Sequence, residues 1–346
     1  MKLRKTKFTN KFMRNDRVFI IAEIGGNFTT FKEATRLIDS AVECCVDAVK
    51  IQTYSAETLS SRKAMFDMEN TGVTSQFELF KKYEISADIH ARIAKYARSK
   101  KMEWFSTPSH QKDVQMLNRL GVKAYKIGSD DAVNIPFLKY LAQQGKPIYM
   151  ATGMCTMKEV CESVAAIQET GNTPLVLMHA VTSYPTHPED VNLLAMKAMM
   201  KVFPEIPVGY SDHTTGITAC VAAAALGARV IEKHFTYDKK ADGPDHMLSA
   251  NPSEMSQLVR QVREVELMLG SGVKCPAKGE KNTRLNNRKS LVVEADINKG
   301  ERLASHNISV KRPGRGIAPK YYEEVMGKTA TRQLKKDSLL RWADLD

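Results

Sequence analysis

The sequence lacks the features that mark membrane-spanning, exported or disulfide-linked proteins. None of its apolar runs reaches about 18 residues, the length that a membrane-spanning helix needs. The basic and polar residues 1–17 contain no apolar core of the kind that a secretory signal carries. The six cysteines are scattered, with no CxxC pair and no zinc-ligand spacing. We therefore expect a reduced, cytoplasmic protein with no membrane partner.

The net charge of +12 is concentrated in two segments. Residues 1–17 carry +6, from seven basic residues and one acidic residue, and residues 271–320 carry +8, from twelve basic and four acidic residues. A nucleic-acid surface is one interpretation of such segments. However, no RNP-like aromatic motif, zinc finger or helix-turn-helix pattern accompanies them. We therefore expect a solvated arm and an interface linker rather than a nucleic-acid partner.

Eight short apolar segments alternate with helical patterns across residues 18–270, and each is apolar throughout, as expected of buried parallel strands. They cover residues 18–23, 47–52, 103–108, 123–128, 147–153, 175–179, 207–211 and 229–234. Thr30 and Glu33 form a capping box where the first helix should begin. This arrangement predicts an α/β fold, a (β/α)8 TIM barrel. A doubly wound sheet is the alternative, although no GxGxxG motif follows the first strand.

The composition changes after Leu269. Residues 270–279 are rich in Gly, Pro and Lys, so we predict a linker over residues 271–285. Residues 286–346 contain short strand-like runs and tight turns, which predict a small second domain. The chain would thus comprise a basic arm (1–17), a barrel (18–270), the linker and this domain. Because about 60 residues bury little surface alone, we expect the small domain to dock on something larger.

Polar side chains stand at the carboxyl ends of the predicted strands, where TIM-barrel enzymes place their reactive groups. His213 and His234 end or follow two neighbouring strands. A single histidine in such a place is more often a hydrogen-bonded structural residue, but two at adjacent ends favour a site for one divalent metal. The other strand ends offer Glu23, Lys50, Gln52, Ser106, Thr107, Lys126, Ser129, Thr152, His179, Ser211 and Glu232.

Several chemical roles remain open for these side chains. Lys50 and Lys126, flanked by apolar residues and accompanied by hydroxyl groups, suit a phosphate site, but one of them can instead form a Schiff base, as in aldolases of this fold. Glu23 either pairs with a lysine or transfers protons. Asp245 and His246, just past the eighth strand, either reach the barrel mouth or form a turn.

The chain resembles the sialic acid synthase family in segments that follow the same order along residues 18–346. The barrel segments are Ile20-Ile-Ala-Glu-Ile-Gly25, Asp47-Ala-Val-Lys-Ile-Gln52, Phe105-Ser-Thr-Pro108, Tyr125-Lys-Ile-Gly-Ser129, Tyr184-Pro-Thr, Gly209-Tyr-Ser-Asp-His213 and Ile231-Glu-Lys-His-Phe235. The later segments resemble the family's antifreeze-like (SAF) domain: Arg288-Lys-Ser-Leu, Asp296-Ile-Asn-Lys-Gly300 and Arg312-Pro-Gly-Arg-Gly-Ile317.

The resemblance implies an enzyme that joins phosphoenolpyruvate to an N-acetylmannosamine-like 2-acetamido hexose, giving a nine-carbon 2-keto sugar acid and phosphate. It implies that His213 and His234 hold Mn²⁺ or Mg²⁺. It implies binding of phosphoenolpyruvate by Lys50, Thr107, Lys126, Ser129, Thr182 and Ser211. It implies that Gln52, Tyr184 and Asp245 face the sugar, that Glu23 handles protons beside Glu232, and that Arg288 reaches the sugar from a second subunit of a domain-swapped dimer.

The chain also departs from the family pattern near the substrates. Phe28 stands where histidine is usual, Ala180-Val181 replace Cys-Thr, and Thr182 stands where some members have asparagine. Because these changes leave the acceptor sugar open, a diacetamido hexose, as in pseudaminic or legionaminic acid synthesis, is an alternative. A binding protein whose barrel has lost activity is a further one.

Overall fold

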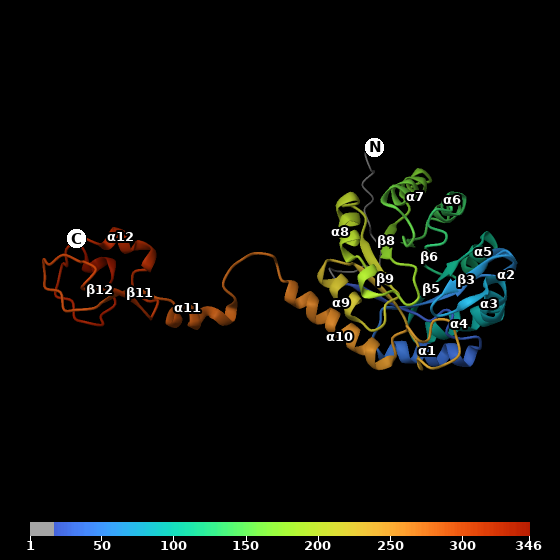
Figure 1. The fold of residues 1–346 in the computed structure, drawn as a ribbon, viewed down its shortest axis with the longest axis horizontal. Helices are drawn as coiled ribbons and strands as arrows, with labels where there is room; N and C mark the ends of the chain where they lie inside the picture. Colours follow the sequence, from blue (N-terminus) through green and yellow to red (C-terminus); the bar gives the residue numbers. More distant parts are fainter. Residues whose placement is uncertain (1–16) are drawn as a thin grey trace. The chain divides into compact units, whose positions relative to one another are not determined.

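The computed structural model describes residues 17–346, so the basic arm lies outside the described residues apart from Arg17. The chain divides after Gly270 into two compact units, each described by itself (Figure 1). We call residues up to Gly270 unit 1 and Ser271–Asp346 unit 2.

Unit 1 is a closed barrel of eight parallel strands in the order β1-β10-β9-β8-β7-β6-β5-β2. This confirms the TIM barrel and excludes the doubly wound sheet, whose edges would be open. The strands are β1 (Phe19–Glu23), β2 (Ala48–Thr53), β5 (Glu103–Pro108), β6 (Tyr125–Ile127), β7 (Ile148–Ala151), β8 (Leu175–Ala180), β9 (Val208–Asp212) and β10 (Val230–His234).

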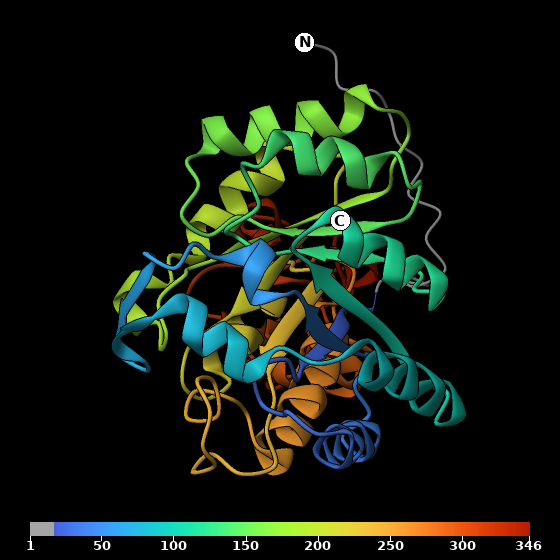
Figure 2. The same cartoon turned by 90° about the vertical axis from the view of Figure 1, so that its right-hand side faces the viewer.

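Helices surround the barrel strands, as Figures 1 and 2 show. The capping box is confirmed, because Thr30 accepts from the backbone of Glu33 and the Glu33 carboxylate accepts from that of Thr30. The helices after the strands are α1 (Phe31–Glu43), α4 (Ala87–Ser99), α5 (Gln111–Arg119), α6 (Ile135–Ala142), α7 (Met157–Glu169), α8 (Leu193–Val202), α9 (Thr218–Ala225) and α10 (Pro252–Leu269).

Between β2 and α4 the chain forms an insertion that the sequence did not predict. It consists of α2 (Ala56–Leu59), an antiparallel hairpin of β3 (Met65–Met68) and β4 (Gly72–Ser75), and α3 (Gln76–Tyr83). The hairpin strands are largely exposed, and Val73 is 73% exposed. Such strands lack the continuous apolar run by which the barrel strands were recognised.

Side-chain alternation along the strands decides which residues enter the barrel. Phe19, Ile21, Phe105, Tyr149 and Met178 belong to one buried cluster that fills its interior. The residues between them along the strands pack in a separate cluster with the helices. Glu23 follows Ile21 by two residues on β1, so its side chain also points into the barrel. The apolar interior is therefore followed by polar groups at the carboxyl ends of the strands.

Unit 2 has its own core and its own small sheet. Strand β11 (Ser290–Val293) pairs antiparallel with β12 (Ile308–Lys311), and α12 (Tyr322–Val325) lies nearby in the chain. Leu291, Val293 and Ile308 lie in its buried cluster. The stretch expected to be a plain linker contains a 3-10 turn, Lys278–Glu280, and the short helix α11 (Lys281–Asn287). Within residues 17–346 no helix is long and apolar enough to cross a bilayer.

Candidate active site

The carboxyl ends of three neighbouring strands bring charged groups to one level of the barrel. Glu23 on β1 lies in register with Lys50 on β2 and with His234 on β10. Glu232, two residues before His234 on β10, lies in register with Ser211 of the next strand, β9. All five side chains are buried, so the protein has removed them from bulk water.

The two lysines and two glutamates form one connected charge cluster. Lys50 forms an ion pair with Glu23, and its Nζ lies 3.5 Å from Glu232 Oε1. Lys126 Nζ lies 3.5 Å from the same oxygen, which also accepts from Ser211 Oγ at 3.1 Å. Glu232 is therefore shared between both ammonium groups. Such buried charges are tolerated because each has an opposite charge or a hydrogen-bonding partner.

The surroundings of these groups shift their proton affinities. Burial lowers the pKa of Lys50 to about 8, although Glu232 opposes the change. Burial works against ionisation of Glu232 too, but the positive charges of Lys126 and Lys50 outweigh it and hold the pKa of this carboxyl below its usual value. Near neutral pH Lys50 is thus mostly charged and Glu232 is ionised, so ionised groups lie buried at the barrel mouth, where a charged ligand can meet them.

Hydroxyl groups and a backbone amide form a second cluster at the ends of β6, β7 and β8. Ser129 Oγ accepts from the backbone N–H of Gly153 at 3.0 Å. A Cβ atom on Gly153 would lie 2.3 Å from Thr182 Oγ1 and 2.7 Å from Ser129 Oγ, so only glycine fits here. The buried Thr182 hydroxyl has no hydrogen-bond partner among the described residues. On the neighbouring strand β5, Thr107 Oγ1 accepts from Lys50 at 3.1 Å. These groups supply donors for phosphate or carboxylate oxygens.

The two histidines predicted as metal ligands face each other. Their ring centroids lie 5.4 Å apart, and both rings are buried. His213 Nδ1 lies 2.6 Å from the carbonyl oxygen of Val181, which fixes the proton on Nδ1 and leaves Nε2 free. His234 Nδ1 has no hydrogen-bond partner within residues 17–346, and a carboxylate oxygen of Asp245 lies 3.6 Å from it. Burial lowers the pKa of His213 to about 4, so its imidazole is neutral and able to bind a metal.

The donor set fits a divalent ion that substrate and water help to hold. Across residues 17–346 no three His, Cys, Asp or Glu side chains gather closely enough to form a complete protein site. Two neutral imidazoles with unoccupied nitrogen atoms suit Mn²⁺ and related ions as partial ligands.

Three of the residues predicted to face the sugar, Gln52, Tyr184 and Asp245, belong to unit 1. Tyr184 packs on both histidines, 4.2 Å from the His213 ring and 6.1 Å from that of His234. Burial raises the pKa of Asp245 to about 7. Gln52 lies close to Gly25: a Cβ atom added to Gly25 would lie 2.7 Å from Gln52 Cγ. Arg288, by contrast, is an exposed residue of unit 2.

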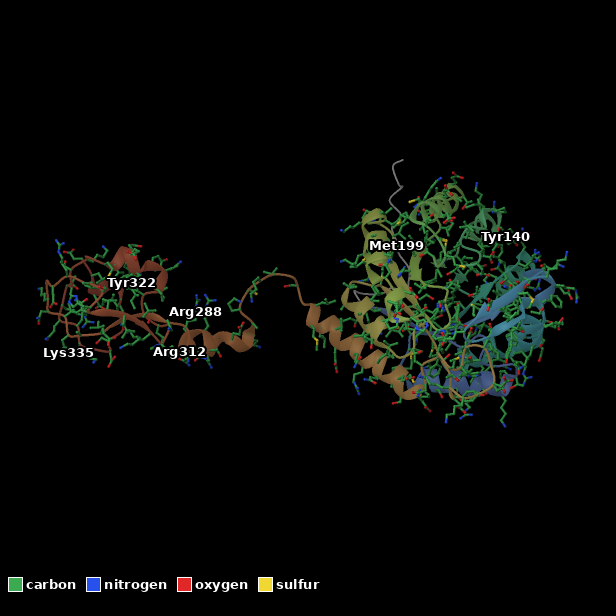
Figure 3. The ribbon with its side chains drawn as sticks, in the orientation of Figure 1. Tyr140, Met199, Arg288, Arg312, Tyr322 and Lys335 are labelled. Atoms are coloured by element: carbon green, nitrogen blue, oxygen red, sulfur yellow. The ribbon has the colours of Figure 1, made fainter. Side chains whose placement is uncertain are left out.

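Figure 3 labels Arg288 and Arg312 in unit 2. The two arginines lie near the same end of the small sheet, because Ser290 pairs with Lys311. Arg288 also lines a shallow pocket within unit 2 together with Lys274 and Arg284. The predicted contact of Arg288 with the sugar stays a prediction.

Asn70, at the tip of the inserted hairpin, is a site residue that the sequence did not reveal. Its Nδ2 donates to the carbonyl of Pro244 at 2.8 Å, and its backbone N–H donates to that of Tyr184 at 3.1 Å. It thereby joins the loops after β8 and β10, while its buried Oδ1 has no hydrogen-bond partner in the part of the chain that the structure describes. The turn-forming residues Asn70-Thr-Gly72 were the signal that could have indicated the hairpin.

Two departures from the family pattern have simple structural accounts. Phe28 is 4% exposed and packs in the core between strands and helices. At position 181 the main-chain carbonyl, not the side chain, contacts His213. A change of side chain from Thr to Val therefore leaves that contact available.

Known proteins resemble the chain over nearly its whole length. It is 38% identical to the N,N'-diacetyllegionaminic acid synthase of Campylobacter jejuni subsp. jejuni, over 94% of this chain and 99% of that one. It is 35% identical to the pseudaminic acid synthase of the same organism, over 96% and 98%. The crystal structure of N-acetylneuraminic acid synthetase from Leptospira borgpetersenii serovar Hardjo-bovis matches with a TM-score of 0.69 and 31% identity, over 77% of this chain and 90% of that one.

The fold and site define a TIM barrel with a polar, charge-rich mouth and a small appended domain. Residues 37–274 match the NeuB family, and residues 288–346 match the SAF domain. The chain belongs to the NeuB family, and the resemblance noted from its motifs is confirmed.

Proposed function

We propose that this chain is a nonulosonic acid synthase that joins phosphoenolpyruvate to a 2-acetamido hexose, releasing phosphate. The observation that carries the proposal is the convergence of a buried lysine–glutamate cluster and two facing histidines at one barrel mouth. Membership of the NeuB family, with relatives named as legionaminic and pseudaminic acid synthases, supports the same reaction.

In this proposal phosphoenolpyruvate occupies the charge cluster and the hydroxyl cluster. Lys50 and Lys126 balance its phosphate and carboxylate charges. Thr107 accepts a hydrogen bond from the Lys50 ammonium group, and Ser211 donates one to the Glu232 carboxylate, so both hydroxyls hold these charged groups in place. Ser129 and Thr182 donate to its oxygens. Charge-assisted hydrogen bonds of this kind are short and strong, which suits an anion with two acidic groups.

The sugar lies on the histidine side of the mouth, between Tyr184, Gln52 and Asp245. The enol carbon C3 of phosphoenolpyruvate forms a bond to the sugar aldehyde carbon, water adds at C2, and phosphate leaves as its C–O bond breaks. A divalent metal held by His213 and His234 would polarise the aldehyde as a Lewis acid.

Glu23 is the proposed proton-transfer group of this site. It lies in register with His234 and pairs with Lys50, so it stands between the proposed metal and phosphoenolpyruvate subsites. From there it can take a proton from the attacking water or give one to the new hydroxyl group. Glu232 lies 3.5 Å from both lysines and orients them around phosphoenolpyruvate, next to the cation that develops at C2.

We also propose how the parts of the chain divide this work. Residues 18–270 would form the synthase barrel, 271–285 the connection, and 286–346 the antifreeze-like domain. Arg288 would reach the sugar's N-acyl group from a second copy in a domain-swapped dimer. The guanidinium group of an arginine carries several N–H donors, which suit the carbonyl oxygen of an N-acyl group.

The product mass tests the reaction. Purified protein with Mn²⁺ and phosphoenolpyruvate is offered N-acetylmannosamine and a panel of diacetamido hexoses, and phosphate release is measured alongside mass spectra. We expect phosphate and a nine-carbon keto acid in equal amounts. Absence of phosphate release with every acceptor would favour a binding protein that has lost activity.

The same panel of hexoses also identifies the acceptor sugar. The 38% identity to a diacetyllegionaminic acid synthase favours a diacetamido hexose as the alternative to an N-acetylmannosamine-like sugar. Borohydride with substrate tests the aldolase alternative: we expect no covalent label on Lys50 or Lys126, because both ammonium groups are engaged by Glu232. A labelled lysine would instead indicate a Schiff base.

A further inference from the structure

A second buried ion pair lies behind the barrel mouth, on the outward side of β9 and β10. Asp212 and Lys233 are 1% and 0% exposed, and their oxygen and nitrogen atoms lie 2.7 Å apart. Because side chains alternate along a strand, Glu232 and His234 point into the barrel while Lys233 points away from it. The pair therefore has no direct access to a substrate in the mouth.

Asp212 collects hydrogen bonds from several elements. Its Oδ1 accepts from Tyr210 OH at 2.8 Å and from the backbone N–H of Thr214 at 3.0 Å. Its Oδ2 accepts from Lys233, from the Thr214 hydroxyl at 3.1 Å and from the thiol of Cys220, on α9, at 3.3 Å. One carboxylate thus ties together β9, the turn after it, α9 and β10.

These bonds hold both neighbours of His213. Asp212 precedes it and Thr214 follows it, and Lys233 binds both, since its Nζ also donates to the Thr214 carbonyl oxygen. His234 is the residue directly after Lys233. The same side-chain contact therefore connects the two backbone segments that carry the facing imidazoles.

Stability alone does not explain such a pair. Removing two charges from water is costly, and well-packed apolar residues in place of a buried ion pair often leave stability unchanged or higher. We infer that Asp212 and Lys233 are positioning residues, which fix the separation and orientation of the His213 and His234 rings so that both can hold one divalent metal. This inference rests on the proposed metal-dependent function.

Binding of Mn²⁺ alone, followed by electron paramagnetic resonance of the free ion, tests the inference without any turnover. Loss of a partner that orients a metal ligand typically weakens metal binding by about 10- to 100-fold. We expect Lys233→Met to weaken Mn²⁺ binding by this amount and to lower the Tm, because Asp212 stays buried without its cation.

The double variant Asp212→Asn/Lys233→Met separates positioning from simple stability. It leaves no unpaired charge, so we expect the Tm to recover while Mn²⁺ binding remains weak. Recovery of both would show that the pair acts only through stability and would overturn the inference. So would wild-type Mn²⁺ affinity in Lys233→Met.

Arg263→Met is the matched control at the opposite end of the barrel. Arg263 pairs with Asp47 at 3.1 Å and donates to the carbonyl oxygen of Val18, just before β1. We expect Arg263→Met to lower the Tm and to leave Mn²⁺ affinity unchanged. If this variant also binds Mn²⁺ more weakly, then any loss of packing weakens metal binding, and a specific role for the Asp212–Lys233 pair is contradicted. If the wild-type protein itself binds no Mn²⁺, the proposed metal site fails, and the inference fails with it.

Discussion

Gly153→Ala should selectively weaken binding of phosphoenolpyruvate. A Cβ atom at this position would lie 2.3 Å from Thr182 Oγ1 and 2.7 Å from Ser129 Oγ, both far inside van der Waals contact. Both hydroxyls must therefore move, and the backbone N–H of Gly153 loses its acceptor on Ser129. A hydrogen bond to a charged group contributes about 1.5–3 kcal/mol. Since about 1.4 kcal/mol corresponds to a factor of ten, losing one such bond should raise the KM for phosphoenolpyruvate about 10- to 100-fold.

Steady-state kinetics with each substrate varied in turn measures this effect. We expect the KM of the sugar to change by less than about threefold, because the two displaced hydroxyls are proposed to bind phosphoenolpyruvate and not the sugar. Gly279→Ala is the matched control, since an added Cβ there meets no atom within 4 Å. An unchanged KM for phosphoenolpyruvate in Gly153→Ala would refute the placement of the phosphate or carboxylate beside Ser129 and Thr182.

Three further predictions concern the charged groups. His213→Ala and His234→Ala should each abolish turnover with a native circular dichroism spectrum; full activity of the wild type in a chelator would contradict the metal role. Arg288→Ala should raise the sugar's KM more than that of phosphoenolpyruvate, and equal effects would argue against its contact with the N-acyl group. Because burial lowers the pKa of Lys50 to about 8, its ammonium charge is lost as pH rises through that value. Phosphoenolpyruvate binding should weaken above pH 8, and Lys50→Arg, which stays charged, should remove that dependence.

The barrel could be predicted because its strands are distinctive in sequence. Strands such as β8, buried at every position, appear as unbroken apolar runs whatever their neighbours are. The hairpin of β3 and β4 could not be recognised in this way, because its side chains are largely exposed. The helix α11 was also missed, since a short exposed segment rich in polar residues gives no periodic apolar signal.

The sequence by itself determined which polar residues end each barrel strand, because alternation along a strand places Glu23, Lys50, Glu232 and His234 on the inner face. Their mutual arrangement was decided only by the closure of the barrel, which brings β1 beside β10 although about 210 residues separate them. Closure makes Glu232 the shared partner of both lysines, and among the described residues it leaves His234 Nδ1 without a hydrogen bond. Periodicity along a strand is a local property, whereas distances between strands depend on how the whole sheet closes.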